Sequence, residues 1–303
     1  MRNHRFLARG FGLMALSALA FASGTVAIKP LASALPGPQI IFVHFLTGLL
    51  VLGPFLFLRG SGFRGHPAWI LVLRGLCGTF SFFFFLRALN LIPLSNTIVL
   101  FCTYPIFVAV FSWVLSETTV EKRDLLLIST GVTGVAILIN PSFHSFNLGY
   151  LYAVLSGAME AMGIVIVAKA RQKNNPFIIH FYFCATGGML SLPFVQGFRM
   201  PDVDGGILLG LSAVAGLMGQ ILMNQGLTFC KPTEGSLILM SEVVFVGAGG
   251  VLIFKDPVTA NFLVGSLLVV ASGVGLTLAN KRSRGELSGV KSQRRRGLGH
   301  GGS

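Results

Sequence analysis

Two acidic side chains stand inside stretches that are otherwise apolar. Glu242 lies near the middle of 236–254, and Glu160 lies among small residues in 148–168. A charged carboxylate at the centre of a membrane helix costs about 2.5–3.5 kcal/mol on insertion scales, so each should face a cavity or a partner. A buried carboxyl that exchanges a proton near neutral pH is also what proton-coupled function requires. The alternative for Glu242 is a neutral, hydrogen-bonded structural role, and Glu160 could equally serve to bond neighbouring helices.

Polar side chains without charge occupy two further apolar stretches. Gly216, Gln220 and Asn224 follow at intervals of four residues and so share one helical face with both donor and acceptor groups. This face could bind a polar solute, or it could hydrogen-bond another helix. Tyr104 comes just before Pro105, which removes a backbone donor and predicts a kink. We therefore expect Tyr104 to line a cavity.

Two arginines fall within a single apolar stretch, 69–89. Arg74 is near its predicted inner end and Arg87 near its predicted outer end. Either would be costly if it faced lipid, so each should snorkel, pair with an acidic group or hold a substrate carboxylate. We keep Arg87 among the candidate solute-binding residues and expect Arg74 to be structural or orienting.

The composition shows what kind of fold must position these residues. In 303 residues, 53% are hydrophobic and only 11% are charged, and the mean hydropathy is +0.78. Soluble globular chains carry about 25% charged residues. A soluble fold would have too little polar surface to cover itself, so the composition excludes a cytosolic enzyme and indicates an integral membrane protein.

Apolar runs of membrane-spanning length recur along the whole chain. A spanning helix needs about 20 mainly apolar residues, and Pro, Gly and charge clusters separate such runs here. Ten helices are predicted, at 11–32, 39–58, 69–89, 95–115, 125–139, 148–168, 177–194, 207–229, 236–254 and 261–279. The first run follows three arginines and resembles a signal peptide, but it is too long for a usual signal sequence and has an internal counterpart.

The distribution of basic residues predicts the orientation, because Lys and Arg are retained on the cytoplasmic side. With the N-terminus inside, 18 of the 23 basic residues fall on the inner side, three fall outside and two lie within the third helix. We therefore expect both termini to be cytoplasmic. We expect the protein to lie in the plasma membrane, which is the inner membrane of a bacterium. The basic segment 281–303 is predicted to be a disordered cytoplasmic tail.

The chain is also internally repeated. A shift of about 138 residues superposes a pattern of glycines, turns and acidic residues. The matched pairs are Ala88-Leu89 with Gly226-Leu227, Glu117 with Asp256, Gly134 with Gly273 and Gly12 with Gly149. The halves are then 11–139 and 148–280, each with five helices. Because five is odd, the second half must enter the membrane from the opposite face, as in the inverted repeats of secondary transporters.

The first half resembles one EamA-type unit of the drug/metabolite transporter superfamily. The residues that carry the resemblance are Arg74-Gly75, Ala88-Leu89, Pro93, Tyr104-Pro105 and Glu117, followed by a glycine-rich fifth helix. The second half keeps Gly226-Leu227, Asp256 and Gly273, but has Ser241-Glu242 where the first half has Tyr104-Pro105. The resemblance implies an all-α integral membrane protein of ten helices in two inverted repeats, with a central cavity. It implies transport of amino acids, nucleotide-related metabolites or other small organic solutes.

Several other functions lack their sequence signatures. There is no nucleotide-binding loop, zinc-protease motif or hydrolase elbow, and the four cysteines form no C-x-x-C pair. We therefore expect no catalytic residues, cofactor or metal. The basic tail lacks interleaved aromatics, so we expect lipid attraction and no nucleic acid. The expected partners are a small-molecule solute and membrane lipids, with a homodimer left open.

The sequence therefore predicts a secondary carrier that works by alternating access, with proton coupling as a further hypothesis. An uncoupled exchanger is the nearest alternative, and a channel or an integral membrane enzyme are the others. Six residues are the candidates for solute binding or coupling, namely Glu242, Tyr104, Gln220, Asn224, Glu160 and Arg87.

Overall fold

The computed structural model describes residues 2–31, 34–60, 62–92, 94–116, 121–140, 147–195, 197–255 and 258–275. Within these ranges the chain is helical and contains no strand. Pro93, Glu117, Asp256 and the tail 281–303, which the sequence analysis used, lie outside the described residues.

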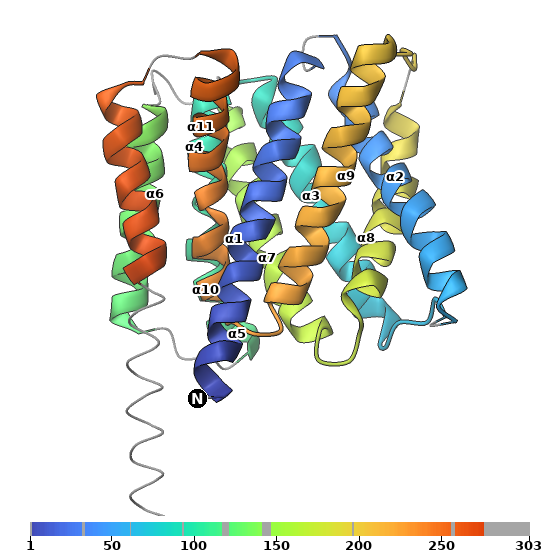
Figure 1. Ribbon diagram of the computed structural model, residues 1–303, viewed down its shortest axis with the longest axis horizontal. Helices are drawn as coiled ribbons and strands as arrows, with labels where there is room; N and C mark the ends of the chain where they lie inside the picture. Colours follow the sequence, from blue (N-terminus) through green and yellow to red (C-terminus); the bar gives the residue numbers. More distant parts are fainter. Residues whose placement is uncertain are drawn as a thin grey trace, which may run out of the picture.

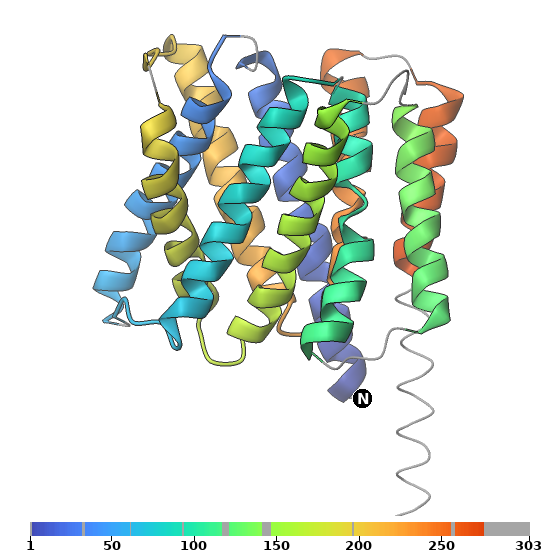
Figure 2. The same ribbon diagram turned by 180° about the vertical axis from the view of Figure 1, so that it is seen from behind.

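The helices stand side by side in one bundle (Figures 1 and 2). Their bounds are α1 Arg2–Ile28, η1 Lys29–Leu31, α2 Gly37–Leu58, α3 Ala68–Leu89, α4 Leu94–Phe101, α5 Tyr104–Ser116, α6 Lys122–Ile139, α7 Leu148–Ala170, α8 Pro176–Ser191, η2 Leu192–Phe194, α9 Val203–Gly226, α10 Pro232–Leu239 and α11 Ser241–Phe254. A further helix covers Ala260–Gly275.

All ten predicted segments contain helix, and the all-α membrane fold is confirmed. Eight helical stretches among the described residues are long and apolar enough to cross a bilayer. They are Ala8–Leu31, Gly37–Leu58, Ala68–Leu89, Asn96–Leu115, Leu148–Ala170, Pro176–Phe194, Val203–Gly226 and Pro232–Phe254. α6 begins with charged residues, and 16 residues of the last helix are described. A count of ten spans therefore stays a prediction for these two helices.

The two halves run in opposite directions through the bundle. α1 starts at the end marked N in Figure 1, whereas α7, the first helix of the second half, starts at the opposite end (Figure 2). The halves also interlock, because α1 packs on α9 while α7 packs on α3. Each helix that opens a half thus packs on the third helix of the other half.

Matching hydrogen bonds mark this relation at the residue level. The Ser17 hydroxyl of α1 donates to the Gly219 carbonyl of α9 at 2.7 Å. In the other half, the Ser156 hydroxyl of α7 donates to the Ser81 carbonyl of α3 at 2.9 Å. Both bonds are buried and join equivalent positions of α1 with α9 and of α7 with α3.

The structure corrects the repeat register in the first helix. Gly10, not Gly12, makes the contact that corresponds to Gly149. A Cβ on Gly10 would lie 2.8 Å from the Phe229 Cβ, and one on Gly149 would lie 2.9 Å from the Leu91 Cβ. No atom comes within 4 Å of a Cβ placed on Gly12. The error arose because the sequence match relied on glycine identity, and α1 carries two glycines one half-turn apart.

Candidate functional site

The fourth and ninth predicted helices are each divided into two shorter helices. The segment 95–115 divides into α4 and α5 at Cys102 and Thr103, and the segment 236–254 divides into α10 and α11 at Met240. A hydroxyl bonds a carbonyl one turn back at each break. Thr103 Oγ1 donates to Leu100 O at 2.7 Å, and Ser241 Oγ donates to Ile238 O at 2.6 Å.

The 138-residue shift that matches Ala88-Leu89 with Gly226-Leu227 also pairs Thr103 with Ser241 and Tyr104 with Glu242. At the breaks, Thr103 and Ser241 make the same contact. The sequence alignment that set Ser241-Glu242 against Tyr104-Pro105 is therefore one residue out of step. Each half places a side chain with a polar end, a phenol in one and a carboxyl in the other, at the start of its second half-helix.

Pro105 explains the break between α4 and α5, as the sequence analysis expected. Proline has no N–H, so it cannot donate to the carbonyl of Phe101 four residues earlier. That carbonyl faces Gly157 of α7, where an added Cβ would lie 2.7 Å from Phe101 O. The close approach of α4 to α7 at this point therefore requires glycine.

The two broken helices meet through Tyr104. Its hydroxyl donates to the carbonyl of Ser236 in α10 at 3.0 Å, and the side chain is buried. The bond joins the start of α5 in the first half to α10 in the second half. An interhelical hydrogen bond in a membrane is worth about 0.6 kcal/mol on average, so it orients the two half-helices more than it stabilises them.

Glu242 and Glu160 approach this junction from two further helices. Glu242 lies in the first turn of α11, and its carboxyl interacts with the Thr25 hydroxyl of α1. It is also within electrostatic range of Glu160 on α7, and both carboxylates are within such range of Tyr104. The sequence-predicted residues Glu242, Glu160 and Tyr104 therefore lie within electrostatic range of one another, and we call these three residues the carboxylate cluster.

Gln220 joins the cluster through Arg74. Arg74 Nη2 lies 3.9 Å from Glu160 Oε1 and donates to Gln220 Oε1 at 3.4 Å. The guanidinium also lies over the ring of Phe183 on α8, with 4.5 Å between Arg74 Cζ and the ring centroid. Arg74 is only 1% exposed. One arginine of α3 therefore contacts α7, α8 and α9 together.

Asn224 lies one turn along α9 from Gln220 and has different partners. Its Nδ2 donates to Pro176 O at 3.4 Å, and its backbone carbonyl accepts from Arg171 Nε at 2.9 Å. Its buried Oδ1 has no hydrogen-bond partner among the described residues. The amide face predicted on this helix is therefore divided, with Gln220 directed to the cluster and Asn224 directed to the connection between α7 and α8.

Arg87 is placed apart from the other candidates. It is exposed in the last turn of α3. A helix rises about 1.5 Å per residue, so Arg87 stands about 20 Å along the axis from Arg74. The structure does not bring Arg87 to the carboxylate cluster, whereas it brings Arg74 there.

Two further residues of α8, His180 and Phe183, were not among the candidates predicted from the sequence. His180 is 4% exposed, its Nε2 lies 3.4 Å from the Cys184 Sγ, and its ring packs on Phe183 at 5.5 Å between centroids. Nδ1 of His180 has no hydrogen-bond partner in the described part of the chain. An ionisable residue inside an apolar segment is itself a functional signal, so His180 could have been found by that criterion.

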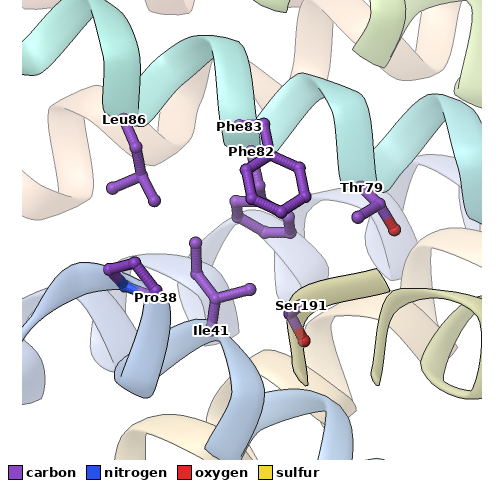
Figure 3. A pocket seen from close by; sticks show the side chains of 7 residues that line it. All are labelled: Pro38, Ile41, Thr79, Phe82, Phe83, Leu86 and Ser191. Atoms are coloured by element: carbon purple, nitrogen blue, oxygen red, sulfur yellow. The ribbon is translucent and has the colours of Figure 1, made fainter. Parts of the chain in front are cut away.

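A small pocket opens elsewhere in the bundle, between α2, α3 and the end of α8 (Figure 3). Its lining is apolar except for two hydroxyls and consists of Pro38, Ile41, Thr79, Phe82, Phe83, Leu86 and Ser191. Both hydroxyls donate within their own helices, Thr79 to Gly75 O and Ser191 to Gly188 O. The pocket offers a polar solute no free donor, so it is a weaker candidate than the carboxylate cluster.

Comparison with known proteins identifies the family. A sequence model described as the EamA-like transporter family matches residues 8–140 and again residues 147–278. The chain belongs to the EamA-like transporter family. The two matches confirm a tandem EamA repeat, and this EamA-like chain is an integral membrane protein and a transporter.

Curated relatives agree with that assignment. Human "Solute carrier family 35 member G1" is 25% identical, covering 89% of this chain and 79% of its own length. An "Uncharacterized transporter" of Archaeoglobus fulgidus is 24% identical, over 77% of this chain and 84% of the relative. A "Probable sugar phosphate/phosphate translocator" of Arabidopsis thaliana is 27% identical, over 71% of this chain and 62% of the relative.

A solved structure has the same fold. One crystal structure, whose title states no function, superposes with a TM-score of 0.79 and covers 91% of this chain and 98% of that one. The sequence identity is 16%, so this likeness concerns the fold alone.

Proposed function

We propose that this chain is a secondary transporter that moves a small polar or amphipathic organic metabolite by alternating access around the carboxylate cluster. The solute would be amino acid-like or nucleotide-related. Solute binding or coupling would rest on Glu242, Tyr104, Glu160 and Gln220, with Asn224 and Arg87 contacting the solute along its path.

The pair of broken helices is the observation that carries this proposal. Transporters with inverted repeats bind solute where discontinuous helices meet near the membrane midplane. Here the break between α4 and α5 joins α10 through the bond from Tyr104 to Ser236 O. Glu242 occupies the equivalent position at the start of α11. Both half-helices α5 and α11 begin inside the bundle, where the positive ends of their dipoles can face a solute.

Proton coupling through Glu242 is the second part of the proposal. Glu242 is an acid inside an apolar membrane-spanning stretch, and ionisable residues at such positions commonly belong to proton relays. Uptake of a proton by Glu242 on one side of the membrane and its release on the other would couple solute movement to the proton gradient. An uncoupled exchanger, in which Glu242 only binds solute, is the alternative.

The family relatives support an organic solute. One relative is named as a solute carrier and another as a probable sugar phosphate/phosphate translocator, and both names denote movement of solutes across membranes. A channel is less well supported, because a pore needs a ring of like groups and the cluster combines one cation with two acids. An integral membrane enzyme is less well supported because the family match and the curated relatives are transporters.

The excess of basic residues on one side supports both termini being cytoplasmic in a plasma membrane, which would be the inner membrane of a bacterium. The halves 11–139 and 148–280 would then act as the two repeats that rock against each other.

Counterflow in proteoliposomes tests the function. A ligand-stabilisation screen of the purified protein over amino acids, nucleosides, sugar phosphates and organic cations first selects solutes, because a true ligand stabilises the folded state. Vesicles preloaded with unlabelled solute should then transiently accumulate labelled solute if the protein is a carrier. The initial rate should saturate as the solute concentration rises. Flux that rises linearly with solute concentration and shows no counterflow would support a channel and contradict the proposal.

A further inference from the structure

The guanidinium of Arg74 is buried with its hydrogen-bonding capacity only partly used. A guanidinium carries five N–H donors. Nη2 reaches Gln220 Oε1 at 3.4 Å, and the nearest carboxylate oxygen, Glu160 Oε1, lies at 3.9 Å. Nη1 has no hydrogen-bond partner among the described residues, and because it is inaccessible to solvent, water at the protein surface cannot supply one. A buried cation with an unused donor calls for an explanation, because such donors are costly to leave unpaired.

The surroundings of Arg74 hold the guanidinium in place without satisfying it. The Phe183 ring covers one face at 4.5 Å from Arg74 Cζ. Nη1 lies between α3 and α7 at two glycines: a Cβ on Gly163 would be 3.0 Å from Nη1, and a Cβ on Gly78 would clash with it. The helix that carries Arg74, α3, and its neighbour α7 thus both have glycine where this side chain passes. They provide space and no acceptor.

The distance to Glu160 indicates what kind of pair this is. Charge-assisted hydrogen bonds between guanidinium and carboxylate are about 2.7–2.9 Å long and are often bidentate. At 3.9 Å, Glu160 balances the charge of Arg74 but leaves the donors open. The Glu160 side chain is 20% exposed while that of Arg74 is 1% exposed, so the carboxylate side of the pair is the more accessible one.

We propose that Arg74 is a specificity-determining residue that binds an oxyanion, either a carboxylate or a phosphate group, of the transported solute. This rests on the proposed function, because the solute must enter the carboxylate cluster to reach the guanidinium. The planar fork of Arg74 matches two oxygens of such a group, and Gln220 can donate through its amide nitrogen. Glu160 is then the internal competitor that holds the charge balance while no solute is bound.

The competitor role separates this proposal from a purely structural ion pair. If Glu160 competes with the solute for Arg74, Glu160→Gln should tighten oxyanion binding, because the variant removes both the competing charge and the repulsion. If the pair only supports the fold, Glu160→Gln should destabilise the protein and no added anion should restore it specifically.

The test measures the thermal unfolding midpoint of the full-length protein, purified in detergent, against the concentration of three probes. The probes are inorganic phosphate, succinate and neutral glycerol, with ionic strength held constant by potassium chloride. The proteins are wild type, Glu160→Gln, the double variant Arg74→Gln with Glu160→Gln, and Arg59→Gln. Arg59 is an exposed arginine at the end of α2 and controls for general loss of positive charge.

Phosphate or succinate should raise the midpoint of the wild type saturably. The half-saturating concentration should fall about 10-fold in Glu160→Gln, since one charge-assisted hydrogen bond is worth about 10- to 100-fold in affinity. The double variant should lose the saturable response, and Arg59→Gln should behave as wild type. A response to phosphate alone would assign a phosphorylated solute, and a response to succinate alone a carboxylate.

Equal responses of the double variant and Glu160→Gln would overturn the proposal, because phosphate also stabilises proteins non-specifically. Absence of a saturable response to either anion in both wild type and Glu160→Gln would overturn it too. Should the double variant fail to fold, Arg74→Lys with Glu160→Gln replaces it. Lysine keeps the charge without the fork, so it should bind about 10-fold more weakly than Glu160→Gln; unchanged affinity would contradict recognition by the guanidinium.

The outcome of this binding test can be told apart from the outcome of the transport test. If a neutral solute shows counterflow while neither anion binds, the carrier stands and oxyanion recognition is wrong. If phosphate or succinate binds through Arg74 while no solute shows counterflow, the binding site stands and the transport proposal is wrong.

Discussion

Four side chains with polar ends form the chemical centre of the bundle, and they come from four different helices. Tyr104 bonds Ser236 O across the two breaks, Glu242 interacts with Thr25 of α1, and Glu160 faces Arg74. Each contact is modest in energy, because polar contacts inside membranes average about 0.6 kcal/mol. Their value lies in directing two acids, one cation and one phenol to a common region.

Glu242→Gln tests proton coupling at this scale. Glutamine keeps the size and hydrogen-bonding capacity of glutamate but cannot exchange a proton, whereas Glu242→Ala also removes contacts. We expect Glu242→Gln to fold and to retain exchange of solute, while net transport loses its dependence on pH. The measurement is initial uptake by proteoliposomes between about pH 5.5 and 8.5, a window centred on neutral pH, near which a coupling group must exchange its proton.

An unchanged pH profile in Glu242→Gln would remove Glu242 from the coupling step, and Glu160 would become the next carboxylate to test. A purely structural Glu242 predicts something different again. In that case Glu242→Gln transports normally at every pH, and Glu242→Ala mainly lowers the yield of folded protein.

Tyr104→Phe tests the link between the two broken helices. The change removes the bond to Ser236 O, which keeps a second donor, the backbone N–H of Met240 at 3.2 Å. We therefore expect a loss of only about 0.5–1 kcal/mol in unfolding free energy, together with slower transport. Unfolding in mixed detergent micelles measures the first and counterflow the second. Transport at the wild-type rate would show that the bond does not orient the half-helices for function.

At the scale of elements, the close contact between α4 and α7 depends on one residue without a side chain. Pro105 frees the Phe101 carbonyl, and Gly157 lets that carbonyl approach the backbone of α7. α7 also meets α3 through Ser81 and Ser156, each of whose hydroxyls donates to the backbone carbonyl of the other residue. Small residues therefore set the helix separation in the half of the bundle that holds Glu160.

Gly157→Ala should destabilise the protein by about 1–3 kcal/mol, because its Cβ would lie 2.7 Å from a backbone oxygen that cannot turn away. Gly210→Ala in α9 is the matched control, since no atom lies within 4 Å of its added Cβ. That control should be neutral or slightly stabilising, as alanine favours helix. Equal midpoints of thermal unfolding for the two variants would mean that α4 and α7 can separate without cost.

At the scale of the whole molecule, the two halves form one interlocked bundle. α1 packs on α9 and α7 on α3, so the main helix contacts run between the halves. Rocking of one repeat against the other would then change the contacts around Arg74, which joins α3 to α7, α8 and α9. The solute site and the moving interface would therefore be the same part of the molecule.

Reporter fusions test the orientation that inversion requires. Fusions after Asn280 and within 171–174 should read cytoplasmic, and fusions near His144 and Asp202 should read external, because 18 basic residues fall on one side and three on the other. Asn280 and His144 lie outside the described residues. If the fusion within 171–174 reads external while the tail reads cytoplasmic, the inverted arrangement is wrong.

The sequence by itself determined that this protein lies in a membrane, where its helices are along the chain, and that the chain is duplicated. Burying backbone groups in hydrocarbon forces helices, so long apolar runs suffice to locate them. Glu242 and Glu160 were recognisable for the same reason, since an acid in such a run is costly. Tertiary structure alone decided that Arg74 lies in the cluster while Arg87, on the same helix, lies outside it. It also decided the contacts of His180, Phe183 and Gly157. Helices that are apolar on every side carry no pattern that marks their inward face, so only packing against neighbouring helices fixes which side chains meet.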